Sequence, residues 1–303
     1  MDAALRKLVF LVNPVSGTRK KEQLHQLITQ TALQYPHGSE VFNTNAEGDY
    51  QWLRDKIAGE QVTDIIIAGG DGTINQVVGA LKDMPVHFGI IPAGSGNGLA
   101  LAAKIPRNQG KALQLVYNGK PKPTDAFTIN NRFACMLSGL GFDAQVAHDF
   151  ARQKTRGLMT YTRESVKNFF SAHPWQFEIT VDGFTFFTEA FFISIANSNQ
   201  FGNQFTIAPG ASLHDGLLDV VIVQKMSRLR LPFAILQQIR GKNKLQQMVN
   251  DLQKKRIIYF QTPSIHIRNI QLAPLHIDGD PAETAPHINA AVIKEQFNLI
   301  CGY

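Results

Sequence analysis

The chain has 303 residues, of which 44% are hydrophobic and 18% charged, and its formal net charge is +6 at pH 7. This profile is typical of a globular protein large enough for two domains, and the longest apolar runs, such as residues 8–12 and 65–68, are far shorter than the roughly 20 residues that cross a bilayer. A positive charge suits nucleic acid, anionic membranes or phosphorylated substrates, but the sequence has no recognition-helix, zinc-finger or aromatic-basic RNA motif, so we expect no nucleic-acid partner. Two lone cysteines, Cys135 and Cys301, make no disulfide framework, and the apolar run near the N-terminus is too short for a signal peptide, so we expect a cytoplasmic protein.

Strand-like and helix-like segments alternate along the first 123 residues. The predicted strands are residues 7–13, 40–44, 64–68 and 88–94, and the helices predicted to follow them are about 20–35, 48–59, 73–81 and 98–104. Consecutive apolar residues, as in 8–12, are typical of a strand that is buried on both faces. The alternation predicts an α/β domain over residues 1–123, with a mostly parallel sheet and helices on both faces.

The pattern changes after residues 121–123, where β-branched and aromatic residues begin to alternate with polar ones. The stretch TVDGFTFF places an Asp-Gly pair between two such runs, which predicts a tight hairpin. We therefore expect a second, mainly antiparallel β domain over residues 124–294, with helical insertions at about 149–171 and 231–254. The tail, about 295–303, is expected to pack back on the first domain.

Unusual loops follow the four predicted strands of the first domain. They read NPVSG, NTNAEG, GGDGT and PAGSGN, in chain order. Ligands of open parallel sheets bind at the carboxyl ends of the strands, so these four loops mark the expected ligand edge.

The GGDGT loop combines three glycines with one carboxylate and one hydroxyl ahead of a helix. Glycines allow close backbone approach, and the N–H groups at a helix start suit a phosphate. Asp71 would repel phosphates unless it holds Mg²⁺ or takes a proton from an attacking hydroxyl. A tight turn with Asp71 as a helix N-cap is the structural alternative. Four such loops at four strand ends favour a nucleotide-phosphate site, although the loop is neither a Walker A motif nor a GxGxxG fingerprint.

Five motifs together resemble the diacylglycerol kinase catalytic-domain family, which includes bacterial lipid kinases, sphingosine kinases and ceramide kinases. They are VNPVSG, GGDGTINQVV, IIPAGSGNGLA, HDGLLDVVIV and IDGDP, in the family's order and across about residues 7–300. GGDGT alone also occurs in similar form in NAD kinases and phosphofructokinases. The resemblance implies an ATP-binding α/β domain of the phosphofructokinase/NAD kinase type, a C-terminal β-sandwich domain, and an active site in the cleft between them.

The resemblance also implies a set of nucleotide-binding residues. These are Asn13, Thr44, Gly69, Gly70, Asp71, Gly72, Thr73, Ile74, Asn75 and Ser95. Thr44 and Ser95 each place a hydroxyl at a predicted strand end, where it could donate to a phosphate. A helix N-cap at Thr44 and an ordinary turn hydroxyl at Ser95 are the alternatives.

Asp215 resembles the family's metal-binding aspartate, with backbone carbonyls near Ser212 and Leu217 as co-ligands. A single carboxylate with carbonyls and waters is ordinary Mg²⁺ chemistry. The alternative is an Asp-Gly β-turn before the strand 217–223, and the two readings are compatible.

The implied acid–base set is Asp71, Asp278 and Asp280, and here the sequence departs from the family. The usual Asp-Gly-Glu triplet is Asp-Gly-Asp, so the acidic group of Asp280 stands one methylene shorter. Bacterial members use the third position as proton acceptor, whereas sphingosine kinases use the aspartate that matches Asp71. Gly98 stands where many bacterial members have an acidic residue, which favours a sphingoid or unusual acceptor lipid.

The expected function is an ATP- and Mg²⁺-dependent lipid kinase that phosphorylates a lipid hydroxyl of the diacylglycerol or sphingoid type. A kinase of a soluble acceptor such as NAD is one alternative, and an inactive lipid-binding protein of the same fold is another. A homodimer also stays open.

The segment 225–256 holds nine Lys or Arg residues and one acid, so it carries +8, more than the whole chain. Leu229, Phe233, Leu236 and Ile239 recur at a spacing compatible with one face of a helix. This pattern predicts transient contact with an anionic membrane and a peripheral location on its cytoplasmic face. The alternative is that the apolar side chains pack on the β domain and the charges are simply solvated.

Overall fold

The computed structural model describes residues 5–15, 21–45, 47–145, 173–200, 206–246 and 255–302. The chain divides into two compact units, residues 1–124 with 295–303 and residues 125–294. The chain passes from one unit to the other within β5 (Lys120–Ile129) and within β15 (His287–Cys301). Within the described residues, no helix is long and apolar enough to span a membrane.

The first unit is built on a parallel sheet. Its strands are β1 (Lys7–Val12), β2 (Gly38–Asn43), β3 (Asp64–Gly69) and β4 (His87–Pro92), joined by the last part of β15 in the order β2–β1–β3–β4–β15. Every neighbouring pair in this order is parallel. All six residues of β3 are buried, as expected for a strand covered on both faces. The predicted α/β domain is therefore confirmed.

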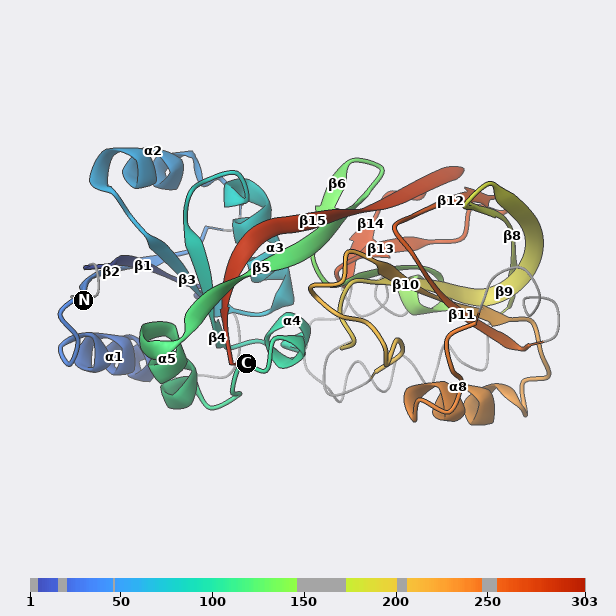
Figure 1. Cartoon of the computed structure of the whole chain (residues 1–303), viewed down its shortest axis with the longest axis horizontal. Helices are drawn as coiled ribbons and strands as arrows, with labels where there is room; N and C mark the ends of the chain where they lie inside the picture. The colour runs from blue at the N-terminus through green and yellow to red at the C-terminus, as the bar shows by residue number, and fades with distance from the viewer. Residues whose placement is uncertain are drawn as a thin grey trace. The chain divides into compact units, whose positions relative to one another are not determined.

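Among the described residues, five helices accompany this sheet. They are α1 (Lys21–Ala32), α2 (Gln51–Glu60), α3 (Asp71–Leu81), α4 (Gly98–Ala102) and α5 (Gln109–Asn118). In Figure 1, α1 and α5 lie on one face of the sheet, and α2 and α3 lie on the other. The sequence did not lead us to predict α5, which begins where the Asn108 side chain accepts a hydrogen bond from the Lys111 N–H at 3.0 Å.

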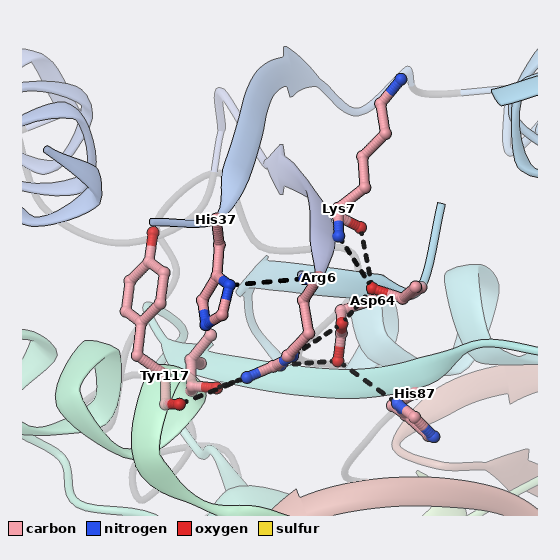
Figure 2. Close-up of polar contacts among 8 residues, drawn as sticks. Arg6, Lys7, His37, Asp64, His87 and Tyr117 are labelled. Atoms are coloured by element: carbon pink, nitrogen blue, oxygen red, sulfur yellow. Dashed lines mark hydrogen bonds and ion pairs between the residues drawn. The ribbon is translucent and has the colours of Figure 1, made fainter. Parts of the chain in front are cut away.

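A buried ion pair fastens the amino ends of these strands (Figure 2). The Arg6 guanidinium donates to both carboxylate oxygens of Asp64, at 2.9 and 2.6 Å, and Asp64 is fully buried. Arg6 also donates to the carbonyl groups of Val116 and Tyr117 at the end of α5. His87 lies 3.4 Å from the same carboxylate. The network ties β1, β3, β4 and α5 at the end of the sheet opposite the glycine loops, so it supports the fold without occupying the ligand edge.

The second unit is mainly antiparallel, as predicted. Its further strands are β6 (Arg132–Ala134), β7 (Leu137–Gly141), β8 (Trp175–Val181), β9 (Phe184–Ala196), β10 (Leu218–Gln224), β11 (Ile257–Thr262), β12 (Ser264–Asn269), β13 (Leu275–Ile277) and β14 (Asp280–Ala282). The first half of β9 pairs with β8, and its second half pairs with β7 and β10. Inward-facing side chains such as Phe177, Ile193 and Phe260 form the core of this sandwich.

Two tight hairpins use an Asp-Gly pair. Asp182 and Gly183 have φ of 48° and 77°, and Val181 pairs with Phe184, which confirms the predicted hairpin. Asp278 and Gly279 have φ of 49° and 87° and connect β13 to β14 in the same way. Two successive left-handed residues match the twist of the flanking strands, and Asp-Gly favours that geometry.

The described residues cover the two predicted helical insertions only in part. The segment 149–171 lies outside the described residues. The second insertion begins as predicted, but α8 (Leu231–Ile239) is followed by non-helical residues 240–246, and residues 247–254 lie outside the described residues. The helix stops because Gly241 adopts a left-handed φ of 66° and its N–H bonds back to the Gln238 carbonyl.

Candidate active site

The GGDGT loop turns β3 directly into α3. The N-cap of α3 is Gly70, in an extended conformation, and among the described residues no side chain caps this helix start. Asp71 is the first helical residue, so the alternative that Asp71 is the N-cap is wrong. The N–H groups of the first turn have no partner within the helix and carry its partial positive charge. Because Gly70 has no side chain, a ligand has room to approach these groups.

The GGDGT and PAGSGN loops touch backbone to backbone. An ideal Cβ on Gly94 would lie 2.4 Å from the Gly70 Cα, and one on Gly70 would lie 3.1 Å from the Gly94 Cα. Only glycine permits this approach. The Ala93 N–H donates to the Gly69 carbonyl at 3.0 Å, and the Asn97 side chain closes the second loop by bonding both the N–H and the carbonyl of Gly94.

The Asp71 carboxylate reaches the second loop as well. It accepts a hydrogen bond from the Leu99 N–H, at 3.3 Å, in the first turn of α4. Ser95 is exposed in the loop before that helix. The carboxylate therefore lies between the starts of two helices, which both favour negative charge.

Asn13 connects the first strand to the same helix. Its side-chain amide donates to the Thr73 hydroxyl at 2.6 Å, and its carbonyl oxygen accepts from the Val15 N–H. Thr44 follows β2 and bonds through its N–H to the Val12 carbonyl; because α2 begins only after Tyr50, Thr44 is not its N-cap. The predicted residues Asn13 and 69–75 thus meet at the carboxyl edge of the sheet.

A pocket of about 440 Å³ opens beside this edge. Val12, Pro14 and Asn43 line it at the ends of β1 and β2, and α1 contributes Glu22, His25 and Gln26. Val12 and Pro14 flank Asn13 in the sequence, and Asn43 precedes Thr44, so the pocket adjoins two of the predicted nucleotide-binding positions.

In the second unit, the two aspartates of the β13–β14 hairpin differ. The Asp278 carboxylate is buried and accepts hydrogen bonds from the N–H groups of Cys135, Met136 and Leu137, at 2.8 to 3.0 Å. Both of its oxygens are used in this way. Asp280 is exposed. The geometry gives Asp278 a structural role and leaves the carboxylate of Asp280 accessible.

A buried histidine, which the sequence did not lead us to predict, supports this hairpin. The His276 Nδ1 accepts a hydrogen bond from the Gly279 N–H at 3.2 Å, so the ring proton sits on Nε2, which lies 3.5 Å from Asp143. Gly139 makes room for the pair, because a Cβ there would lie 2.1 Å from the Asp143 carboxylate. The pair holds the middle of the Asp278–Asp280 turn.

The loop that carries Asp215 is a turn, as the compatible alternative proposed. The Asp215 carboxylate accepts from the Leu217 N–H at 3.1 Å, and Gly216 has a φ of 69°. Ser212 accepts from the His214 N–H in the same loop. Desolvation raises the pKa of Asp215 above its usual value, and the charge of nearby Asp125 raises it further.

A cation would fit this loop on chemical grounds. A carboxylate with a raised pKa beside a second carboxylate gains from a positive charge, and the loop offers backbone carbonyls as further oxygen ligands. In the described part of the chain, no three His, Cys, Asp or Glu side chains gather as a metal site. An Mg²⁺ ion here would therefore rely on Asp215, carbonyl oxygens and water.

Asn197 joins the two parts of this site within the second unit. Its buried side-chain amide donates to the carbonyl of Asp125, at 2.8 Å, and to the carbonyl of Cys135, at 3.1 Å. Asp125 in turn accepts from the Gly216 N–H at 2.7 Å. Asn197 thus couples the loop under Asp278 to the loop of Asp215. The only signal in the sequence was a polar ANSN stretch that ends a long apolar strand.

The comparison with known proteins covers both units. Residues 7–129 match the family model of the diacylglycerol kinase catalytic domain, and residues 137–300 match the YegS C-terminal NAD kinase beta sandwich-like domain. The chain belongs to the diacylglycerol kinase catalytic-domain family of lipid kinases. The resemblance inferred from five short motifs is therefore confirmed, and membership of this family supports a kinase.

Individual relatives agree with the family. The chain is 28% identical to a diacylglycerol kinase of Bacillus subtilis (strain 168), over 96% of this chain and 98% of that protein. It is also 28% identical to a "Probable lipid kinase YegS-like" of Shewanella frigidimarina, over 74% and 72% of the two chains. A crystal structure of a diacylglycerol kinase from Bacillus anthracis str. Sterne has a TM-score of 0.75 at 20% identity, covering 99% and 98%, which confirms the fold.

Proposed function

We propose that the protein is an ATP-dependent lipid kinase that transfers the γ-phosphoryl group to a lipid hydroxyl, of diacylglycerol or of a sphingoid base. The observation that carries this proposal is the start of α3, where an uncapped helix N-terminus meets a second glycine loop and a carboxylate. Backbone N–H groups at such a position favour phosphate. Phosphate binding alone needs no carboxylate, whereas phosphoryl transfer can use one to hold Mg²⁺ or to take a proton from the attacking hydroxyl.

The nucleotide would extend along the carboxyl edge of the parallel sheet. Its phosphates would lie on the first turn of α3, and Asn13 would hold that turn through Thr73. The pocket beside Asn13 and Thr44 is large enough for a base and ribose, and its histidine and glutamine offer polar contacts. Mg²⁺, held through Asp215 as the motif resemblance implies, would supply the positive charge that phosphoryl transfer needs.

The proton acceptor is assigned to Asp71 or Asp280, and not to Asp278. A general base must reach the acceptor hydroxyl with a free lone pair, whereas both Asp278 oxygens already accept backbone N–H groups. Asp280 is exposed, although its arm is one methylene shorter than the family's glutamate. Diacylglycerol and sphingosine both present a hydroxyl at a membrane surface, so both are tested as acceptors.

The test is ATP consumption with and without a lipid mixture that contains diacylglycerol and sphingosine. Lipid-dependent consumption and a radiolabelled lipid product are expected. Asp71→Asn should keep the fold and lower turnover about a hundredfold or more, because an acid–base or metal contribution is lost. Asp55→Asn, an exposed change in α2, serves as the matched control. Consumption that requires NAD, or no consumption with any acceptor, would contradict the proposal, and unchanged turnover in Asp71→Asn would remove Asp71 from it.

A further inference from the structure

Helix α8 presents apolar side chains on its exposed face. Its inner face is fixed by Leu231 and Gln238, which are buried, and by Ala234 and Ile235, which pack against the core. The outer face should then be polar in an ordinary surface helix. Instead, Phe233 is 64% exposed and Leu236 is 40% exposed, and Leu229 just before the helix is 92% exposed. The alternative that the four apolar side chains pack on the β domain is therefore wrong for Leu229, Phe233 and Leu236, whereas Ile239 is half-buried.

A basic pocket adjoins this apolar face. It has a volume of about 870 Å³ and lies between α8, residues 242–244 and the chain that leads into β11. Leu229 and Phe233 form its apolar side, and Arg230, Lys242, Lys244 and Lys255 are among its basic lining residues. The pocket thus joins an apolar surface to a cluster of positive charge.

The cations of this pocket have no counter-charge within the described residues. The side chains of Arg230, Lys242, Lys244, Lys255 and Arg256 are exposed, and none of them forms a hydrogen bond or ion pair with the part of the chain that the structure describes. Five like charges around one pocket repel one another, so an anion that enters the pocket is attracted by all five.

The rim of the pocket is held in place by hydrogen bonds of two side-chain amides, those of the half-buried Asn243 and the buried Gln246. Asn243 donates to the Gln238 side chain at 2.9 Å and to the Ile257 carbonyl at 3.1 Å. Gln246 bonds through its N–H to the Tyr259 carbonyl and through its side chain to the Ile257 carbonyl. Lys242 and Lys244 flank the anchored Asn243, so their backbone positions are set before any ligand arrives. A preformed site loses less conformational entropy on binding.

The chemistry of this surface selects among possible occupants. A second copy of the chain would bring the same five cations to the interface, and like charges oppose that contact. Nucleic acid would use the cations, but it offers nothing that would bury Leu229 and Leu236. A phospholipid membrane with anionic headgroups satisfies both parts at once, because cations bind headgroup phosphates while apolar side chains enter the acyl boundary.

We propose that the α8 face, defined as Leu229, Phe233, Leu236 and the basic pocket, docks on an anionic phospholipid membrane. The apolar side chains insert at the level of the headgroups, and the pocket holds the phosphodiester of a lipid. Contacts of this kind give reversible docking and no permanent anchor. The proposal stands apart from phosphoryl transfer, because docking needs neither nucleotide nor turnover.

The test is co-sedimentation of the full-length protein with vesicles, without ATP. One set is phosphatidylcholine alone, and the other contains phosphatidylglycerol as well. We expect binding to the second set that weakens as salt rises. The triple variant Lys242→Glu, Lys244→Glu, Lys255→Glu should bind about a hundredfold more weakly, since each basic residue near an anionic leaflet strengthens binding roughly fivefold. The double variant Leu229→Ser, Phe233→Ser should also bind more weakly.

Matched controls separate the face from net charge and from general hydrophobicity. Arg107→Glu, Lys111→Glu, Arg132→Glu changes the charge equally at exposed positions elsewhere, and Leu33→Ser, Phe187→Ser removes two other exposed apolar side chains. Both controls should bind as the parent does, and thermal unfolding should show that every variant is folded. The proposal is overturned if the parent does not bind the vesicles, if it binds an oligonucleotide in preference to them, or if the charge control loses as much binding as the pocket variant.

Discussion

Replacing Gly94 by alanine should push the two glycine loops apart. The new Cβ would lie 2.4 Å from the Gly70 Cα and 3.1 Å from the Asn97 side-chain oxygen. Ordinary contact between two carbon atoms needs about 3.5 Å, so the loops must separate by about 1 Å. Backbone atoms stand on one side of the clash, and they cannot turn away as a flexible side chain would.

The geometry predicts an order of stability for three alanine variants. Overpacking costs about 1 to 3 kcal/mol where side chains can adjust, so Gly94→Ala should cost about 3 kcal/mol or more. Gly70→Ala meets the Gly94 Cα at 3.1 Å and should cost about 1 kcal/mol. Gly59→Ala meets no atom within 4 Å inside α2 and should stabilise the protein by about 0.5 kcal/mol.

Urea unfolding followed by tryptophan fluorescence can measure this order. The chain has two tryptophans, Trp52 in the first unit and Trp175 in the second. A Trp175→Phe background leaves Trp52 as the reporter of the unit that contains the loops. ATP affinity, measured by calorimetry, should fall most in Gly94→Ala. The reasoning is refuted if Gly94→Ala unfolds at the same urea concentration as its parent, or if Gly59→Ala is the least stable of the three.

Three other predictions concern buried or coupled carboxylates. Arg6→Ala should lower the free energy of unfolding by about 3 to 5 kcal/mol, because the Asp64 carboxylate stays buried without its partner. A further Asp64→Asn change should restore part of the lost stability, as measured by urea titration. Equal stability of the single and double variants would contradict this reasoning. Burial raises the pKa of Asp219 to about 6, so the contribution of the protonated Asp219 to stability is fully present below pH 4 and is lost as the pH rises toward 6. The free energy of unfolding should therefore fall by about 3 kcal/mol over this pH range. Urea unfolding curves should show this fall in the parent and not in Asp219→Asn. Asp278→Asn should lower the melting temperature, because one amide oxygen cannot accept all the N–H hydrogen bonds that the two carboxylate oxygens accept. Asp280→Asn should leave the melting temperature unchanged and reduce turnover. The reverse pattern would exchange the roles of the two aspartates.

The parallel sheet could be predicted because its signal is local. Consecutive apolar residues marked β1, β3 and β4, and the glycine loops marked their carboxyl ends, within a few residues of the observed bounds. The two helix errors arose where one residue decides the outcome. The cap at Asn108 starts α5, and the left-handed Gly241 ends α8, yet neither changes the hydrophobic period on which the prediction rested.

The supporting residues of the site could not be predicted from patterns, because their partners are far away in the sequence. Asn197 bonds to the carbonyls of Asp125 and Cys135, more than sixty residues earlier, and His276 faces Asp143, more than a hundred residues earlier. A lone asparagine at a strand end or a histidine in an apolar run carries no local signal. Only pairing of β7 with β9 and β13 brings these side chains together.

The acidic residues of the motifs divide by how the fold treats their charge. Asp278 is satisfied within the second unit, since three backbone N–H groups compensate its burial. Asp215 is treated in the opposite way, because desolvation and the Asp125 carboxylate both make its negative charge less favourable. A fold that fully compensates one carboxylate and leaves another poorly compensated gains from a cation only at the second. The same comparison separates an aspartate whose carboxylate is used in backbone hydrogen bonds from one whose carboxylate gains from a cation, a difference that the motif sequences alone do not contain.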